Sequence, residues 1–164
     1  MKLILVEKYS KKHNKEIVMK IVLIGCTSKK MNYPCKAIEM YSKSSLFRKE
    51  LNFAEKILQA DKIFVLSAKY HLLPIDKTIE PYNKSLNDKG LSKKDRELWA
   101  ETVFTDLKKE VNTTDEIVFL CGQRYYEFLE EKLMEMVKIS FPLRNMGGIG
   151  KQLKFLTESL SNAD

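Results

Sequence analysis

The sequence predicts a three-layer α/β domain with a mostly parallel central sheet of about four to five strands, and two observations predict it. Four short apolar runs, 20–26, 62–68, 116–122 and 137–142, are rich in β-branched and aromatic residues and lack polar alternation. Such runs are typical of strands buried on both faces. Apolar positions at helical spacing follow each run. Strands that alternate with helices form a parallel sheet through right-handed crossovers.

One helix is expected after each apolar run. In chain order, the apolar faces are formed by Phe47, Leu51, Ala54 and Leu58; by Trp99, Val103, Leu107 and Val111; by Tyr125, Phe128, Leu129 and Leu133; and by Ile149, Leu153, Leu156 and Leu160. Ser92, followed three residues later by Asp95, indicates a capping box at the start of the second helix.

The first 18 residues stand apart from this pattern. Residues 3–6 and 17–24 flank the polar stretch "KKHNK" and are compatible with an edge hairpin. Met19 is a second plausible start directly before the first core strand. Because the core pattern is complete without them, we interpret residues 1–18 as an N-terminal extension and 19–164 as a single α/β domain.

Composition excludes several classes of protein. The chain has 164 residues and a hydrophobic content of 44%, which fits one globular domain. No apolar run is long enough to cross a bilayer, so no membrane partner is expected. The three cysteines are few and odd in number, which favours a reducing, cytoplasmic setting over a disulfide framework. With no C-x-x-C spacing and only two histidines, we expect neither a metal site nor a cofactor.

The formal net charge of +7 is compatible with a polyanionic partner, of which nucleic acid is the most common. The alternative is an ordinary lysine-rich surface. Lysine far outnumbers arginine, and arginine is the residue that reads bases and phosphates bidentately. The oligomeric state stays open.

The carboxyl ends of the strands predict the position of the site, because ligands of open α/β sheets bind in the crevice beyond them. The first exit, "GCTSKK", offers Cys26, Thr27, Ser28 and Lys29 to a phosphate, although it has no Walker spacing. A nucleophilic Cys26 would need a nearby base, and the alternative is a small buried residue at a strand end.

The last two exits offer further anion-binding groups. In "CGQRYYEFL", Gly122 allows close backbone approach, Arg124 is placed to face an anion or a base edge, and Tyr125 begins the following helix. In "PLRNMGGIGKQ", Arg144 and Lys151 flank a helix N-terminus. A simple turn with an exposed arginine is the alternative reading of Arg124.

The stretch "VLSAKYHLLPIDKTIEPYNKSL", residues 65–86, is unusually long and polar for a connection. We interpret it as one wall of a pocket for a base, in which Tyr70 and Tyr82 supply faces for stacking. Lys69 is a candidate phosphate contact or amine nucleophile, and Pro81 holds Glu80 in extended backbone. Ser67 and His71 complete the candidate binding residues. The alternative is a structural loop whose apolar residues pack beneath the sheet edge.

Three segments, "GCTSKK", "YSKSSLFRKELNFAEK" and "LSAKYHLLPIDKTIEPYNKSL", resemble a bacterial and phage family of unassigned function. Its pattern is L-S-A-K-Y-G-L-L followed by I-x-P-Y, and it is distantly similar to the YaaA-like peroxide-stress family. His71 departs from it, because glycine is common there. If that position needs a positive φ, His71 is a strained adaptation; if it does not, His71 is a candidate site residue of this particular chain. The resemblance implies a compact α/β fold and a link to DNA, ahead of RNA, through DNA protection and modified-base chemistry.

The leading hypothesis is an enzyme acting on a nucleic-acid or nucleotide base by N-glycosidic cleavage, with Glu80 and Lys69 as its catalytic residues. Glu80 would stabilise the cationic sugar or activate water, while the other candidates hold the phosphate and the departing base. DNA glycosylases provide an analogy at the level of the fold. The alternatives are a non-catalytic DNA-binding or stress-protection module and a hydrolase or transferase of free nucleotides.

Overall fold

The computed structural model describes residues 18–163 and contains a five-stranded sheet in the order β4-β3-β1-β6-β7. The strands are β1 (Lys20–Gly25), β3 (Lys62–Ser67), β4 (His71–Pro74), β6 (Glu116–Leu120) and β7 (Lys138–Ser140). All neighbours pair in parallel except β4, which runs antiparallel to β3. The predicted mostly parallel α/β fold is confirmed. The expected N-terminal extension or hairpin lies, apart from Val18, outside the described residues.

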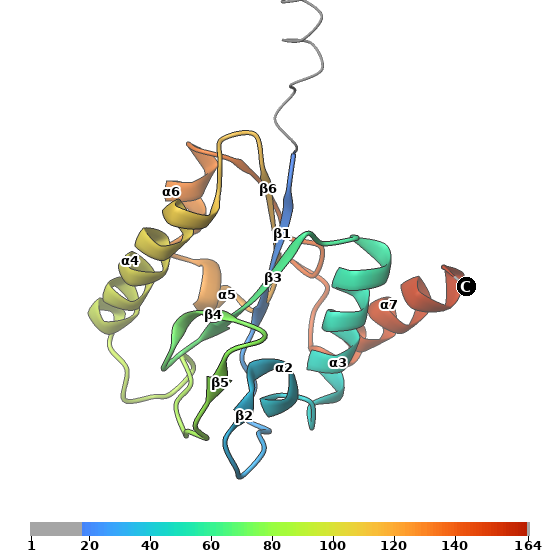
Figure 1. Ribbon diagram of the computed structural model, residues 1–164, viewed down its shortest axis with the longest axis horizontal. Helices are drawn as coiled ribbons and strands as arrows, with labels where there is room; N and C mark the ends of the chain where they lie inside the picture. The colour runs from blue at the N-terminus through green and yellow to red at the C-terminus, as the bar shows by residue number, and fades with distance from the viewer. Residues whose placement is uncertain (1–17, 164) are drawn as a thin grey trace, which may run out of the picture.

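Helices cover both faces of the sheet (Figure 1). One face carries α2 (Ala37–Met40), α3 (Ser45–Asn52) and α7 (Ile149–Asn162), and a π-helical turn, Phe53–Ile57, continues α3. The other face carries α4 (Lys93–Glu110), α5 (Gln123–Tyr126) and α6 (Glu130–Met134). Two short strands, β2 (Cys35–Lys36) and β5 (Thr78–Ile79), form a separate antiparallel pair near α2.

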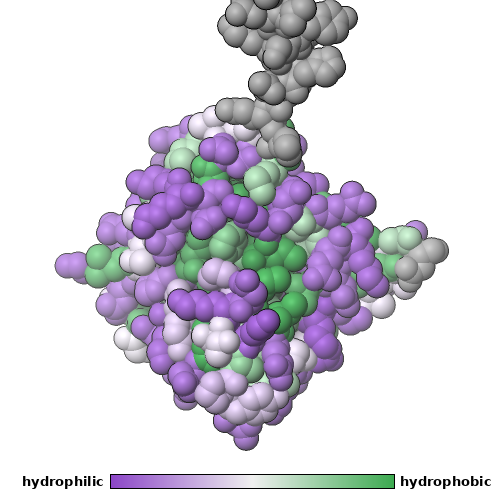
Figure 2. Space-filling model, in the orientation of Figure 1, coloured by the Kyte–Doolittle hydropathy of each residue, from purple (hydrophilic) through white to green (hydrophobic). Residues whose placement is uncertain are grey.

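The central strand β1 divides the core between these faces. Ile21 and Leu23 pack toward α4, whereas Val22 and Ile24 pack toward α3 and α7. All four side chains are fully buried, which explains why the strand shows no polar alternation. Each contributes roughly 1.5–3 kcal/mol of burial free energy. Figure 2 shows that the surface of the molecule is largely hydrophilic, with apolar side chains visible near the middle of the face in view.

Serine N-caps set the starts of α4 and α3. Ser92 and Asp95 form the predicted capping box of α4, in which the Ser92 Oγ accepts from the Asp95 N–H at 3.1 Å and the Asp95 carboxylate accepts from the Ser92 N–H at 2.9 Å. Ser44 caps α3 with one hydrogen bond, in which its Oγ accepts from the Phe47 N–H at 3.2 Å.

The chain path creates a switch point between β1 and β6. From β1 the chain passes through α3 to β3 on one side, and it then crosses through α4 on the opposite face to reach β6 on the other side. The connections leaving β1 and β6 therefore diverge, and a crevice is expected between the carboxyl ends of these two strands.

Candidate functional site

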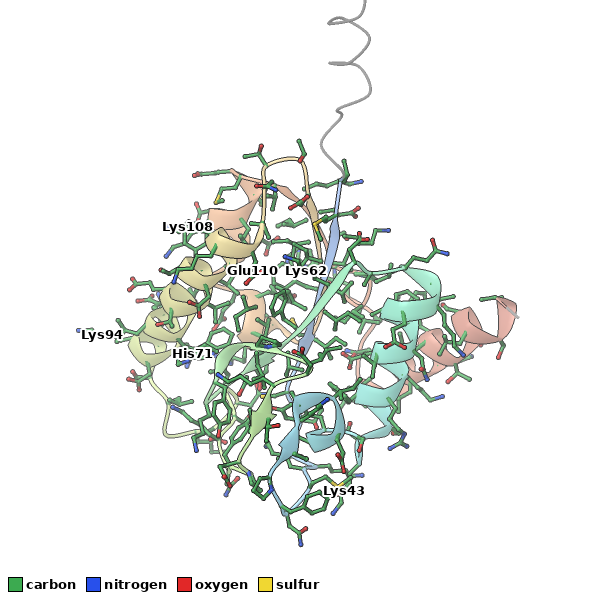
Figure 3. The ribbon with its side chains drawn as sticks, viewed as in Figure 1. Lys43, Lys62, His71, Lys94, Lys108 and Glu110 are labelled. Atoms are coloured by element: carbon green, nitrogen blue, oxygen red, sulfur yellow. The ribbon has the colours of Figure 1, made fainter. Side chains whose placement is uncertain are left out.

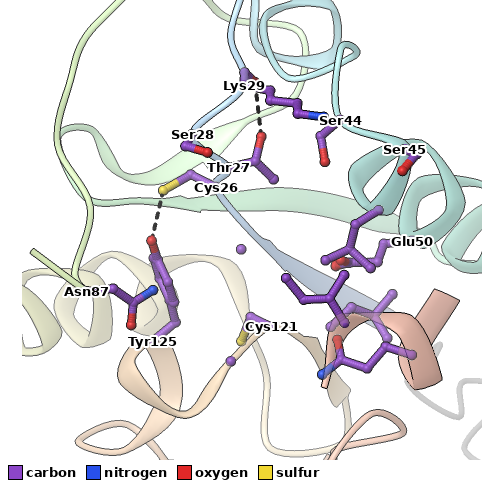
Figure 4. A pocket seen from close by; sticks show the side chains of 16 residues that line it. Cys26, Thr27, Ser28, Lys29, Ser44, Ser45, Glu50, Asn87, Cys121 and Tyr125 are labelled. Carbon is purple, nitrogen blue, oxygen red and sulfur yellow. Dashed lines mark hydrogen bonds between the residues drawn. The ribbon is translucent and has the colours of Figure 1, made fainter. Parts of the chain in front are cut away.

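A cavity of about 400 Å³ lies at this switch point. Its floor is formed by the ends of β1 and β6, from Gly25 and from Leu120, and its rim by the loop after β1 and by the starts of α3 and α7 (Figure 4). A volume of this size suits a small organic ligand. Six of the predicted binding residues line it: Cys26, Thr27, Ser28, Lys29, Gly122 and Tyr125.

The floor depends on the close approach of β1 and β6. Gly25 has no side chain, and a Cβ atom at this position would stand 3.0 Å from the Cys121 Cβ. The strand end thus needs glycine for space. The same packing sets Cys121 at the base of the cavity, where burial raises the pKa of its thiol and keeps it protonated.

Glu50 is the most unusual group in the cavity. It lies on α3 and is only 4% exposed, and its Oε2 has no hydrogen-bond partner among the residues that the structure describes. Burial raises the pKa of this carboxyl well above its ordinary value, because an ionised carboxylate loses its hydration there. The environment therefore favours the protonated acid, which can donate a hydrogen bond or a proton.

Cys26 and Tyr125 form a polar contact elsewhere in the cavity. The Cys26 Sγ is 3.1 Å from the hydroxyl oxygen of Tyr125, which enters from α5 (Figure 4). Burial raises the pKa of Tyr125, so its hydroxyl stays protonated. The lining also includes Asn87 and Gln152, which bring amide groups from the loop before α4 and from α7.

Two helices begin at the rim. Ser45 and Leu46 open α3, and Ile149 opens α7 after the N-cap Gly148, which has no side chain to cap the helix. The first N–H groups of a helix lack partners inside it and carry a partial positive charge. In Figure 4 the amine of Lys29 extends along the rim in the direction of Ser44. The rim therefore favours an anion.

Stretch 65–86 does not line this cavity, and Ser67 organises its structure instead. The buried Ser67 Oγ accepts from the Tyr70 N–H at 2.9 Å and lies 2.9 Å from the Tyr82 hydroxyl. The Trp99 indole N–H donates to the Ser67 carbonyl at 2.9 Å. The Tyr82 hydroxyl is also 2.6 Å from that of Tyr41. These bonds fasten the stretch to the sheet and to α4.

The two predicted catalytic residues lie on the outside of this stretch. Glu80 and Lys69 are both exposed, and neither lines the cavity. The Glu80 N–H donates to the Tyr70 hydroxyl at 3.2 Å, while the Lys69 amine lies 5.2 Å from the centre of the Tyr70 ring. The structure thus brings Glu80, Lys69 and Tyr70 together at the exit of β3, outside the cavity.

His71 has a positive φ of 61°, which is the condition for the strained adaptation considered from the sequence. It pairs with Ser67 across a tight β3–β4 hairpin, and three-residue hairpin loops commonly end in a residue of left-handed conformation. Burial lowers the pKa of its imidazole. His71 lines a second, smaller cavity of about 260 Å³ together with Lys84 and Trp99.

The remaining predicted residues are engaged elsewhere. Arg124 is exposed on α5 and lies 3.7 Å from the Glu127 carboxylate. Arg144 forms an ion pair with Glu130 and stacks 3.8 Å from the centre of the Phe141 ring. Lys151 is exposed on the first turn of α7, and neither it nor the two arginines lines the main cavity.

Glu50 escaped the sequence analysis, although a signal for it was present. It lies three residues after Phe47 and four before Ala54, so it shares the apolar stripe of α3 with two fully or nearly fully buried side chains. A carboxylate on such a stripe is rarely buried without a function or a partner. Ser44, Ser45 and Gln152 gave no comparable signal.

The residues that the structure describes contain no cluster of histidine, cysteine or acidic side chains arranged to hold a metal ion. Within the same part of the chain, no helix combines the length and the apolar character that crossing a membrane requires.

Comparison with known proteins places the chain in a family without giving it an activity. No curated protein and no solved structure gives a significant match. A family model described as "Family of unknown function (DUF6884)" matches residues 21–158, from β1 into α7. The predicted membership in a family of unassigned function is confirmed, while the more distant YaaA-like similarity stays a prediction. The chain belongs to the DUF6884 family of unknown function.

Proposed function

We propose that the protein is an enzyme that acts on a nucleic-acid or nucleotide base and hydrolyses its N-glycosidic bond in the switch-point cavity. The observation that carries this proposal is Glu50, a residue that lines a ligand-sized space and whose buried carboxyl has an oxygen without a partner among the described residues. Carboxyl groups with a raised pKa in a cleft are typical of general acids.

The departing base needs a proton, and Glu50 supplies it in this mechanism. The C1′–N bond breaks, its electron pair stays on the base, and the Glu50 Oε2 proton moves to a ring nitrogen or exocyclic atom of that base. Water then adds to the cationic C1′ and returns one proton to Glu50, so the acid is regenerated. The products are a free base and a sugar that bears a new hydroxyl group.

The other groups of the cavity support base release as hydrogen-bond donors and positive charges, and none of them gains or loses a proton. Cys121 and Tyr125, both protonated, line the space near the base as hydrogen-bond donors. Lys29 and the helix starts at the rim stabilise negative charge on the substrate. Glu80 was the sequence-based candidate for the carboxyl role; its exposure leads us to assign the general acid to Glu50, and a role for Glu80 and Lys69 stays a prediction.

The test incubates the purified protein with single- and double-stranded DNA carrying ordinary, damaged and modified bases, and with free nucleosides and nucleotides. Released base is measured by chromatography, and abasic sites by alkali-induced strand breaks. Glu50→Gln keeps the shape of the neutral acid but cannot transfer its proton, so we expect release to fall by about 10²–10⁴-fold.

Two matched variants make this result specific. Glu55→Gln changes an exposed glutamate on the adjoining π-helical turn and should leave release unchanged. Glu80→Gln tests the sequence-based candidate. Release that survives Glu50→Gln would refute the assigned role, and release lost only in Glu80→Gln would return that role to Glu80. Polymer binding with steep salt dependence and no release would favour the non-catalytic module.

A further inference from the structure

We propose that the cavity contains a phosphate subsite between the N-termini of α3 and α7, and that its ligand is a free phosphorylated mononucleotide. This inference rests on the proposed function, because it names the substrate class of the same cavity. Four observations support it: two helix starts on one rim, the buried Glu50 beneath them, a lysine beside them, and the limited size of the space.

The helix starts supply the donors. Ser44 uses its Oγ to accept from the Phe47 N–H, and Ser45 and Leu46, whose N–H groups precede it and have no partner inside the helix, both line the cavity. Helix α7 begins after Gly148, so no side-chain cap competes for its first N–H groups. With 8 residues in α3, continued by the π-helical turn, and 14 in α7, both helices are long enough to present a positive end.

Glu50 points to a ligand independently of the helix starts. Its Oε2 is buried without a partner among the described residues, which indicates that a bound molecule completes its hydrogen bonding. A protonated carboxyl tolerates a nearby phosphate, whereas an ionised one would repel it. Among the described residues that line the cavity, Lys29 is the basic side chain, so the subsite pairs one lysine with two helix ends.

The spacing of these groups fits one nucleotide. Glu50 lies five residues after Ser45 on α3, so their Cα atoms are roughly 8 Å apart along the helix axis. Helical side chains lean toward the N-terminus, which shortens the gap to a phosphate at the helix start. One sugar bridges such a gap, with the phosphate at the rim and the base beside Glu50.

The positions of basic side chains outside the cavity favour a free nucleotide over a nucleic-acid polymer. A polymer needs basic groups that follow its backbone beyond the cavity. Lys94 and Lys108 are exposed on α4, none of whose residues lines the cavity, and Lys43 is exposed in the turn before α3, beside the lining residue Ser44 (Figure 3). The two lysines on α4 therefore do not extend the basic rim of the cavity.

The test measures binding by calorimetry with adenosine, guanosine, cytidine and uridine, with their 5′-monophosphates, and with short single-stranded oligonucleotides. At least one monophosphate should bind about tenfold or more tightly than its nucleoside and than the oligonucleotides. Ser45→Asp places a negative charge in the subsite, and because aspartate is favoured in the first turn of a helix, the variant should fold normally. Ser45→Asn is its neutral counterpart of equal size.

We expect Ser45→Asp to weaken monophosphate binding about tenfold or more relative to Ser45→Asn, with little effect on the nucleoside. Lys154→Ala, an exposed change on α7 outside the cavity, should leave both affinities unchanged. Equal affinity for nucleoside and monophosphate, equal effects of the two Ser45 variants, tighter oligonucleotide binding, or no binding of any monophosphate would each overturn the subsite. Phosphate-dependent binding without base release supports the subsite and refutes the glycosidase, while base release without phosphate preference does the reverse.

Discussion

Replacement of Glu50 by glutamine should make the protein more stable, and increasingly so as the pH rises. Burial raises the pKa of Glu50 in the folded state well above its ordinary value of 4.5, while the unfolded chain keeps that ordinary value. Above the ordinary value the unfolded state releases a proton that the folded state retains, so the free energy of unfolding falls with pH. This loss continues until the pH passes the folded-state pKa of Glu50. Above that pKa, the contribution of Glu50 to the free energy of unfolding no longer changes with pH.

The magnitude follows from one proton. A single site changes the free energy of unfolding by at most about 1.4 kcal/mol per pH unit between its two pKa values. Glutamine does not ionise, so it removes this slope while it preserves the shape of the protonated acid. The free energy of unfolding of Glu50→Gln should therefore exceed that of the wild type by a margin that grows by up to about 1.4 kcal/mol per pH unit. This growth starts above the ordinary pKa of glutamate and ends at the folded-state pKa of Glu50.

Urea unfolding of the wild type, Glu50→Gln and the exposed control Glu55→Gln at several pH values from about 5 to about 8 measures this difference. Both substitutions replace one carboxyl by an amide, so their effect on the charge of the unfolded chain is matched. Parallel pH profiles for the wild type and Glu50→Gln would refute the reasoning, because they would show that Glu50 ionises equally in both states.

Three other substitutions test how the site is held. Gly25→Ala should lower the free energy of unfolding by about 1–3 kcal/mol, because its Cβ would stand 3.0 Å from the Cys121 Cβ; chemical denaturation measures this, and Gly90→Ala, in open space, should be near neutral. Ser67→Ala should lower it by about 1–3 kcal/mol, since the Tyr70 N–H and the Tyr82 hydroxyl lose a buried partner; a change below the error of the unfolding curves would contradict that role. His71→Val should be less stable than His71→Gly by about 1–2 kcal/mol, because a positive φ penalises a β-branched side chain, and equal midpoints of thermal unfolding would argue against a strained His71.

Local patterns made the sheet and its helices predictable, because burial on both faces of β1, β3 and β6 leaves a continuous apolar run in the sequence. The pattern could not show where the helical segment after β6 breaks. A turn near Leu129 divides it into the short helices α5 and α6, while Tyr125, Leu129 and Leu133 still pack into one core. The antiparallel strand β4 was also missed, because its four residues follow a three-residue turn and read as part of a long loop.

The site was predictable only to the extent that it depends on strand order. The rule that ligands bind beyond the carboxyl ends of strands selected Cys26 to Lys29 and Gly122, all of which line the cavity. It also selected the exit of β3, whose residues lie elsewhere. The reason is geometric: the cavity opens between β1 and β6, and the hairpin to β4 carries stretch 65–86 toward the sheet edge. Chain order alone does not reveal which neighbouring strands diverge.

The polar residues of stretch 65–86 and the buried Glu50 differ in whether their polar groups have partners. Tyrosine, serine and tryptophan side chains in that stretch and on α4 satisfy each other, which gives a rigid joint with polar groups that have partners. Glu50 has the opposite properties: it occupies an apolar stripe, faces a cavity, and has an oxygen without a partner among the described residues. A fold gains nothing from such a group, because an apolar residue there would pack without the desolvation of a carboxyl. Its presence is therefore best explained by a ligand, and the chemistry of this protein is to be sought at α3.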